Sequence, residues 1–227
     1  MAVRALAFDV FGTLVDWRSG IADAFRDTGV SGDPGELADG WRARYRPILE
    51  EVNNHVRPWG NFDDLHLVTL EDLLGERNIV LPLEERRRLV GVWHRLDPWP
   101  DVVTGLQTLR SAHVISTLSN GHLALLIDLA RHGSLQFDCL LSAELAHAYK
   151  PAPEAYLTAA RLLGVAPSEL MLVAAHPWDL GGARAAGLQT AFVARPLEYG
   201  PASPRHEDPG ADVSALDLHE LAEVLGH

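Results

Sequence analysis

The chain opens with a short apolar run that ends at polar residues. Val3 to Phe8 is apolar apart from Arg4, and an apolar run of this length is typical of a buried parallel strand. Asp9 and Thr13 follow it, with Gly12 between them where the backbone must turn. Because ligands of open α/β sheets bind beyond the carboxyl ends of the strands, both side chains are candidates for a site. An aspartate in this position is also a common turn former, so its position alone does not decide its role.

A long helical block follows this first strand. From Ile21 to about Trp93, apolar residues recur at helical spacing, and stretches rich in glycine and proline at 32–35 and 57–60 divide the block into separate helices. Pro98 and Pro100 end the pattern. We therefore predict an all-helical cap domain over residues 17–98, inserted into a core domain made of residues 1–16 and 99–227.

Beyond this block, short apolar runs alternate with helical patterns. This alternation predicts an α/β fold in which a doubly wound, Rossmann-like parallel sheet is covered by helices. The expected strands are His113–Leu118, Phe137–Leu141, Leu170–Ala174 and Thr190–Val193. The expected helices are one that Asp101 caps, one through Leu126 and Leu129, and Pro153–Leu163, Asp179–Ala186 and Asp217–Leu225, with a proline-rich loop over Leu197–Gly210.

Composition narrows the class of protein. The 227 residues are 47% hydrophobic, so a large core is expected, and the net charge of −12 argues against nucleic acid or an anionic membrane as the main partner. The single cysteine, Cys139, excludes an internal disulfide, and its apolar surroundings predict a buried thiol. Since no apolar stretch is long enough to span a bilayer, we expect a soluble, cytoplasmic protein.

Polar residues follow the predicted strands in four short motifs. They are Asp-x-Phe-Gly-Thr-Leu at 9–14, Leu-Ser-Asn-Gly at 118–121, Tyr-Lys-Pro at 149–151 and Pro-Trp-Asp at 177–179. Their order resembles the haloacid dehalogenase superfamily, and more closely its 2-haloacid dehalogenase branch. The resemblance covers nearly the whole chain, including a helical cap between the first and the second motif. It implies a hydrolase that acts on carbon–halogen bonds.

The residues of these motifs suit such chemistry. An aspartate at a strand end, here Asp9, can attack carbon or phosphorus as a nucleophile, and a nearby lysine keeps such a carboxylate ionised. A lone Lys-Pro pair is more often a solvated surface lysine. However, almost all of the 19 basic residues are arginine, and Lys150 is held between Tyr149 and Pro151. We therefore predict a functional Lys150 that acts on Asp9.

The residue two positions after Asp9 distinguishes two reactions. Superfamily phosphatases resemble one another in having a second aspartate there, which protonates the leaving alkoxide, and a backbone carbonyl beside it helps to hold magnesium. This chain has Phe11, and Ala174, Ala175 and His176 stand where acidic magnesium ligands are usual. A halide leaves without a proton, so we predict a dehalogenase that needs no metal or other cofactor. The alternatives are a magnesium-dependent phosphatase of a small ester and a non-catalytic member that binds a small acid.

The resemblance also implies a role for each site residue. Asp9 forms an ester with C2 of a small (S)-2-haloalkanoic acid such as a haloacetate, with inversion, and water then hydrolyses the ester. Thr13 holds Asp9, while Ser119 and the backbone amides after Asp9 hold the substrate carboxylate. Asp179 orients Lys150 and the water. The remaining predicted contacts to substrate or halide are Val10, Phe11, Asn120, Tyr156, His176 and Trp178.

The cap is expected to contribute the cation for the leaving halide. The family has an arginine directly after a tryptophan on an early cap helix, and Trp41-Arg42 is similar to this pair. Arg44 and Arg46 are nearby alternatives that are otherwise surface charges. Weaker candidates for the aromatic wall of the halide site are Tyr45, Trp59 and Phe62.

Two positions depart from the family pattern. Ala174 stands where the family has serine, and His176 stands where it has asparagine, so water activation or pocket shape must differ. We hypothesise that a neutral His176 narrows the halide pocket and favours a small halide such as fluoride, as in fluoroacetate. A histidine that only fills space is an equally weighted alternative. The expected partner is a small-molecule haloacid, and a homodimer is left open.

Overall fold

The central feature of the fold is a five-stranded sheet in the order β2-β1-β3-β4-β5, with every neighbouring pair parallel. The structure is a computed structural model that describes residues 3–201 and 207–226. β1 lies in the middle of the sheet, where Ala5 pairs with Val114 on one side and Leu170 on the other. The strands are β1 (Ala5–Phe8), β2 (Val114–Thr117), β3 (Leu170–Ala174), β4 (Gln189–Val193) and β5 (Val213–Ala215).

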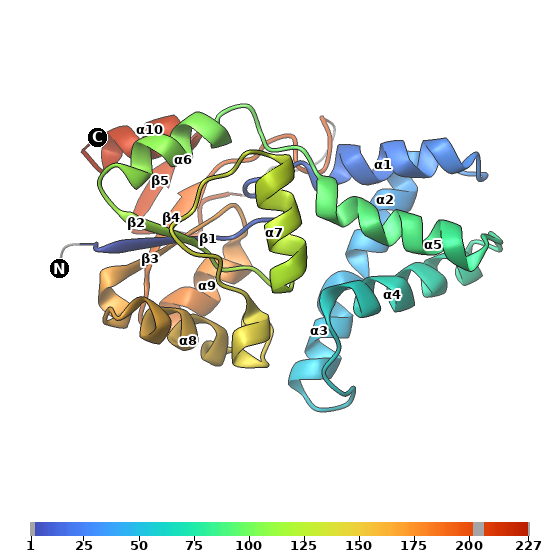
Figure 1. Cartoon of the computed structure of the whole chain (residues 1–227), viewed down its shortest axis with the longest axis horizontal. Coiled ribbons are helices and arrows are strands. Elements are labelled where there is room, and N and C mark those ends of the chain that lie inside the picture. The colour runs from blue at the N-terminus through green and yellow to red at the C-terminus, as the bar shows by residue number, and fades with distance from the viewer. Residues whose placement is uncertain (1–2, 202–206, 227) are drawn as a thin grey trace.

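Helices cover both faces of this sheet, which confirms the predicted doubly wound α/β fold (Figure 1). α6 packs on α10 along one face, and α8 packs on α9 along the other. α7 lies on the side of the sheet that faces the inserted helices (Figure 1). The helices of this half are α6 (Val102–Arg110), α7 (Leu123–His132), α8 (Pro153–Leu163), α9 (Pro177–Ala185) and α10 (Leu218–Val224), with short 3₁₀ turns η2 (Ala143–Ala146) and η3 (Pro167–Glu169).

The block between β1 and α6 forms a helical cap beside the sheet (Figure 1). The two chain segments that enter and leave it lie side by side, because the Asp16 amide donates to the Asp97 carbonyl at 2.9 Å and the Trp99 amide to the Leu14 carbonyl at 2.9 Å. The exact boundaries, 17 and 98, stay a prediction. The cap consists of α1 (Trp17–Thr28), α2 (Pro34–Ala43), α3 (Tyr45–Asn53), α4 (Phe62–Glu76), α5 (Leu83–Val90) and the 3₁₀ turn η1 (Gly91–Arg95).

Aromatic side chains join the cap to the core. Phe11, on the loop after β1, stacks on Phe62 with ring centroids 5.3 Å apart and meets Trp93 edge-on at 5.6 Å. Trp41 also packs edge-on against Trp93, at 5.5 Å, and its indole N–H donates to Thr69 Oγ1 at 3.0 Å. These aromatic contacts fix the loop that carries the first motif against the cap, at an energetic gain beyond the area they bury.

The predicted strand over Phe137–Leu141 is wrong. The segment runs beside β2 but makes only isolated bridges, from Cys139 to Ser116 and from Ser142 to Ser119. Side chains replace the regular ladder here, because Asp138 Oδ2 accepts the Ile115 amide at 3.0 Å. The Thr117 hydroxyl likewise donates to the Leu141 carbonyl at 2.8 Å and accepts from the Leu141 amide at 2.9 Å. Cys139 is half-buried rather than buried, and burial raises the pKa of its thiol.

The structure differs from the sequence predictions at two further places. Asp101 precedes α6 but does not cap it, because its carboxylate accepts both Arg195 Nη1, at 2.8 Å, and the Leu218 amide, at 2.9 Å. β5 was not predicted, since three residues carry too little pattern. Within the predicted loop Leu197–Gly210, residues 202–206 lie outside the described part, and the rest contains neither helix nor strand.

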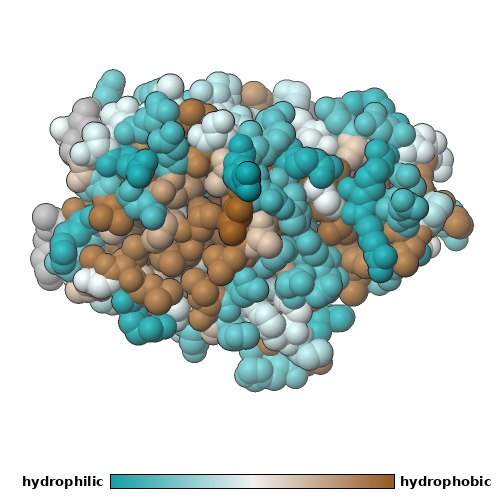
Figure 2. Space-filling view, in the orientation of Figure 1, coloured by the Kyte–Doolittle hydropathy of each residue, from teal (hydrophilic) through white to brown (hydrophobic). Residues whose placement is uncertain are grey.

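The surface of the face in Figure 2 is mixed. Polar side chains prevail over the cap half, whereas an apolar area lies on the core half, left of centre in this view (Figure 2). Exposed large apolar residues of the core half include Ile127, Leu145 and Leu157. Within the described residues, none of the helices combines the length and the apolar composition that crossing a membrane requires.

Candidate active site

The motif residues gather at the carboxyl edge of the sheet. Asp9 directly follows β1, and its amide continues the pairing by donating to the Val173 carbonyl of β3 at 3.0 Å. Ser119 comes two residues after β2, and His176 comes two residues after β3. Lys150 precedes α8 and reaches the same edge from the side. Strand ends that are far apart in sequence thus place acid, base and hydroxyl groups together, as expected for an open α/β sheet.

Asp9 is held at both carboxylate oxygens. Oδ1 lies 2.9 Å from Lys150 Nζ, while Oδ2 accepts the Thr13 hydroxyl at 2.7 Å and lies 3.0 Å from His176 Nδ1. The Thr13 hydroxyl is itself fixed by the Ala175 amide, at 2.9 Å. Burial opposes ionisation of Asp9, but the charge of Lys150 and the hydrogen bond from His176 outweigh it and hold the pKa of Asp9 well below its usual value. The carboxylate is therefore anionic, and its orientation is fixed.

Lys150 is fully buried between two carboxylates. Its Nζ lies 2.9 Å from Asp9 Oδ1 and 2.5 Å from Asp179 Oδ2, and Tyr156 donates to Asp179 Oδ1 at 2.6 Å. Burial lowers the pKa of Lys150, but Asp179 and Asp9 outweigh it and raise that pKa above its usual value. Burial raises the pKa of Asp179, although Lys150 opposes this. The predicted placement of Lys150 and Asp179 matches this geometry, and Tyr156 supports Asp179.

His176 bridges Asp9 and a residue that the sequence did not reveal, Glu198. Its Nε2 lies 2.9 Å from Glu198 Oε1, which also accepts the Trp17 indole N–H at 3.0 Å. Burial opposes protonation of the ring, but Glu198 and Asp9 outweigh it and raise the pKa of His176 to about 10. The expectation of a neutral His176 is therefore wrong, because two buried carboxylates flank the ring. Gly12 (φ 88°) allows this packing, since a Cβ there would overlap the Glu198 carboxylate.

Arg42 lies in an aromatic cage. Its guanidinium carbon is 4.3 Å from the centroid of the Tyr45 ring, 5.3 Å from that of Trp17 and 6.0 Å from that of Trp93. Arg42 is 8% exposed, and within the described residues its buried Nη1 has no hydrogen-bond partner. A desolvated guanidinium nitrogen with this spare donor is a binding position for an anion.

The two other candidate arginines of this region, Arg44 and Arg46, differ in position. Arg44 donates to the Gly40 carbonyl at 2.5 Å and pairs with Glu76 near the surface. Arg46 lies over the Trp178 ring at 5.1 Å, and Trp178 stacks beside His176 at 5.8 Å. A cavity of about 250 Å³ is lined by Arg42, Tyr45 and Arg46 of the cap and by His176, Trp178 and Tyr199 of the core. The cavity opens between cap and core, beside the groups that hold Asp9.

Loop residues of the first and second motifs are buried behind the site. The Asn120 amide is used at both ends, accepting the Lys150 amide at 2.8 Å and donating to the Tyr45 hydroxyl at 2.8 Å, which favours a positioning role. The Ser119 hydroxyl accepts the Gly121 amide at 3.1 Å. The structure also buries Val10 and Phe11.

Two of the weaker aromatic candidates differ in position. Phe62 stacks on Phe11, next to the site, whereas Trp59 stacks on Tyr149 at 4.5 Å and contacts His147. Among the described residues, the one group of side chains with ligand atoms close enough to share a metal ion is Asp63, His94 and His122. That group does not include Asp9.

Comparisons with known proteins agree with this arrangement. The family model for haloacid dehalogenase-like hydrolases matches residues 3–187. The chain is 33% identical to (S)-2-haloacid dehalogenase 1 of Pseudomonas sp. (strain CBS-3), over 98% of this chain and 96% of that protein.

Solved structures give the same result. The L-2-haloacid dehalogenase PA0810 is 46% identical, with a TM-score of 0.93 and 99% of each chain covered. The L-2-haloacid dehalogenase from Xanthobacter autotrophicus with chloropropionic acid covalently bound is 26% identical, with a TM-score of 0.86 and 98% of each chain covered. The motifs, the fold with its cap and these similarities show that the chain belongs to the haloacid dehalogenase-like hydrolases, in the branch of the L-2-haloacid dehalogenases.

Proposed function

We propose that the protein hydrolyses small (S)-2-haloalkanoic acids, haloacetates included, to 2-hydroxy acids through an ester on Asp9. The observation that carries the proposal is a buried, anionic Asp9 whose oxygens are held by Lys150, Thr13 and His176, beside a cap cation with a spare donor, Arg42. The named activity of the relatives supports the same reaction. The test is release of halide from chloroacetate and (S)-2-chloropropionate by the purified protein.

The first half-reaction forms the ester. One Asp9 oxygen attacks C2 of the substrate from the side opposite the halogen, and the carbon–halogen bond breaks as the Asp9 Oδ–C2 bond forms. Lys150 and Thr13 keep the carboxylate ionised and hold it in one orientation. We assign the substrate carboxylate to the loop of Ser119 and to the amides of Val10 and Phe11, and we assign the departing halide to Arg42. Backside attack inverts the configuration at C2.

The role of Arg42 gives a direct prediction. Arg42→Lys is expected to lower kcat for chloroacetate by well over about tenfold, because a flexible point charge replaces a fixed guanidinium where negative charge develops. Arg44→Lys is the matched control, since Arg44 pairs with Glu76 and the Gly40 carbonyl instead. The measurement is steady-state halide release. Normal turnover by Arg42→Lys would place the halide elsewhere, and Arg46 would be tested next.

The second half-reaction hydrolyses the ester, and we assign water activation to His176. The family pattern of serine and asparagine is absent here, while His176 Nδ1 lies 3.0 Å from the Asp9 carboxylate. Glu198 holds the opposite ring nitrogen at 2.9 Å, which fixes the ring and stabilises its protonated form. His176 is thus the proposed catalytic base, and Glu198 is a positioning residue that acts through it.

Protons and charges balance in this scheme. His176 is protonated in the free enzyme, and loss of the Asp9 negative charge on ester formation removes one of the two carboxylates that hold its proton. The ring then releases that proton as halide leaves. In hydrolysis, water attacks Cγ of Asp9, the ring takes a water proton, and it returns this proton to the product oxygen as the ester bond breaks. Asp9 is left as a carboxylic acid and passes its proton to His176, which restores the starting state.

We also propose that this reaction needs no divalent metal. Lys150 Nζ already provides a positive charge between Asp9 and Asp179, at 2.9 and 2.5 Å, and the Phe11 side chain offers no oxygen ligand. Chloroacetate turnover is therefore expected to be unchanged after exhaustive treatment with EDTA. Activity that is lost and then restored by magnesium, together with hydrolysis of p-nitrophenyl phosphate, would instead identify a phosphatase.

The cavity beside Arg42 and His176 can accommodate the proposed substrates. A cavity of about 250 Å³ suits two- and three-carbon acids, which supports haloacetates, fluoroacetate among them, and 2-halopropionates. Because both ring nitrogens of His176 lie within hydrogen-bond distance of carboxylates, a direct donor role of this ring to fluoride has no support. A homodimer stays a prediction, to be measured by light scattering.

A further inference from the structure

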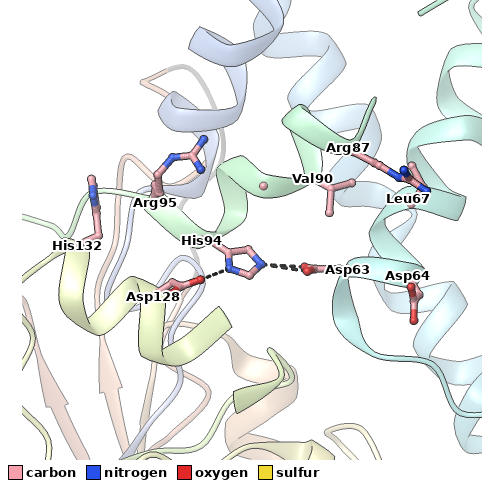
Figure 3. Close-up of a pocket in the computed structure, with 10 residues that line it drawn as sticks. Asp63, Asp64, Leu67, Arg87, Val90, His94, Arg95, Asp128 and His132 are labelled. Atoms are coloured by element: carbon pink, nitrogen blue, oxygen red, sulfur yellow. Dashed lines mark hydrogen bonds and ion pairs between the residues drawn. The ribbon is translucent and has the colours of Figure 1, made fainter. Parts of the chain in front are cut away.

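A cluster of two histidines and two aspartates lies where the cap meets the core, outside the site around Asp9. His94 belongs to η1 and Asp63 to α4, both in the cap, while His122 directly precedes α7 and Asp128 lies within it, in the core. Figure 3 shows His94 between Asp63 and Asp128, with the imidazole ring pointing across the cap–core boundary. The cluster therefore joins both parts of the molecule through side chains that bind metals.

Three of these side chains present ligand atoms to one point. Asp63 Oδ2 lies 3.0 Å from His94 Nε2 and 3.7 Å from His122 Nε2, and one ligand atom from each residue lies within 4.8 Å of the others. In a tetrahedral site with zinc–ligand bonds of roughly 2.0–2.2 Å, neighbouring ligand atoms are roughly 3.3–3.6 Å apart. The two separations from Asp63 lie on either side of this range, and the ligand atoms of His94 and His122 lie within 4.8 Å of each other, so side-chain movement would be needed to bind an ion.

The surroundings of His94 are those of a metal-binding histidine, whereas those of His122 are not. His94 uses its other nitrogen, Nδ1, on Asp128 Oδ2 at 2.7 Å, which is the carboxylate–histidine pair that orients imidazole ligands of metals. His122 occupies the N-cap position of α7, and its side chain makes no capping hydrogen bond. Its Nδ1 is buried and has no hydrogen-bond partner among the described residues. The nitrogen that faces Asp63 is the other one, Nε2, so the case for a metal site rests on the placement of the three ligand atoms and on the pairing of His94 with Asp128.

We propose that Asp63, His94 and His122 bind one Zn²⁺ ion, with Asp128 orienting His94. Two imidazoles and one carboxylate favour zinc over magnesium or calcium, which prefer oxygen ligands. Asp63, His94 and Asp128 also help to line a cavity of about 650 Å³, from which water would complete the coordination of the proposed ion. The competing arrangement has a proton in place of the metal, with a cationic His94 between Asp63 and Asp128.

The proposed ion would clamp the cap to the core. It ties α4 and η1 to the residue that follows Gly121, on the loop that carries Ser119 and Asn120. A ligand that binds the folded protein and not the unfolded chain stabilises the folded state, so zinc should raise the melting temperature. The inference does not depend on the proposed function, because its readouts are binding and stability.

The test begins with protein freed of metal by a chelator that is then removed. Isothermal titration with ZnCl₂ is expected to give one ion per chain, with a rise in melting temperature that EDTA reverses. Co²⁺ in the same protein should give the visible absorption of a tetrahedral site. If neither zinc nor cobalt produces these signals, the cluster holds only a proton and the proposal is wrong.

Variants separate the proposed site from adventitious binding by the other histidines. His122→Gln and Asp63→Asn should each weaken zinc binding by at least about 100-fold, since a ligand is lost, and Asp128→Asn by about 10–100-fold through His94. His132→Gln is the matched control, because His132 also pairs with an aspartate, Asp97, at 2.9 Å, but lies outside the cluster. Equal zinc affinity and cobalt spectra in His122→Gln and the unchanged protein would overturn the assignment. Halide release measured alongside keeps this result distinct from failure of the proposed function.

Discussion

Replacing Asp9 with asparagine is expected to lower kcat/KM for chloroacetate by at least about 10³-fold, because the charged nucleophile is removed while its neighbours remain. Asn keeps the shape of the side chain and an oxygen for the Thr13 hydroxyl, so the loss reports chemistry rather than packing. Lys150 then keeps only the Asp179 carboxylate. Asp9→Ala is the companion variant, since it cannot revert to aspartate by deamidation. Circular dichroism checks that both variants are folded.

The route of the oxygen atom tests the same role of Asp9 without a variant. With enzyme in excess over substrate in heavy-oxygen water, one turnover should place the heavy oxygen in the Asp9 carboxylate, because water attacks the protein carbon of the ester. The hydroxy acid of that first turnover should carry ordinary oxygen from Asp9. Peptide mass spectrometry measures both. Heavy oxygen found directly in the first product would mean that water attacks the substrate and that Asp9 is not the nucleophile.

The part of the fold that sequence predicts well is the part whose burial is regular. The strand predicted over Val3–Phe8 nearly coincides with β1. A strand that is paired on both sides and covered on both faces needs an unbroken apolar run, and such a run is visible in the sequence. The Phe137–Leu141 segment has similar composition but forms no strand, since Asp138 and Thr117 satisfy the backbone with side chains instead. No local pattern reports that a neighbouring side chain will replace a ladder hydrogen bond.

Some residues of the site could also be predicted from the sequence, and others could not. Asp9, Lys150 and Asp179 could be predicted, because each belongs to a short motif next to a strand or helix end, where the chain must present its polar groups. Glu198 could not, since it lies on the irregular segment after β4 and meets His176 only through tertiary packing. The prediction of a neutral His176 was wrong for the same reason, since it did not include Glu198. Burial alone opposes protonation of the ring, whereas Glu198 and Asp9 together outweigh burial and raise the pKa of His176.

Glu198 changes the electrostatic balance of the site. Three buried carboxylates, Asp9, Asp179 and Glu198, face Lys150 and His176, so each of these two cations has a second acidic partner besides Asp9. In the proposed ester on Asp9, Lys150 would keep Asp179 as its partner and His176 would keep Glu198. The proposed mechanism then requires His176 to give up its proton, and an imidazole does so more readily than the Lys150 ammonium because its ordinary pKa is lower.

His176→Gln is expected to separate the two half-reactions. Glutamine cannot accept a proton from water, so ester hydrolysis should slow by about 10²–10⁴-fold, the usual contribution of a general base, while ester formation is affected less. Mixing with excess chloroacetate should then give a rapid burst of one halide per site followed by slow turnover. The Asp9 peptide should gain the mass of the ester. The burst itself shows that the variant is folded and that its nucleophile works.

Glu198→Gln tests the positioning role in the same assay. Glutamine keeps an acceptor oxygen for the Trp17 indole and for His176 Nε2 but removes the charge, so hydrolysis should slow by less than in His176→Gln. Glu198→Asp should recover part of the rate, which a purely structural role would not explain.

The timing of proton release in the unmodified enzyme distinguishes a proton-accepting His176 from a packing residue. Because His176 must be neutral before it can accept a proton from water, the solution proton should appear with the halide burst in single-turnover stopped flow with a pH indicator. Proton release that coincides with the slower hydrolysis would mean that His176 stays charged in the ester. A variant that loses both half-reactions equally, with no ester detected, would likewise exclude His176 as the base.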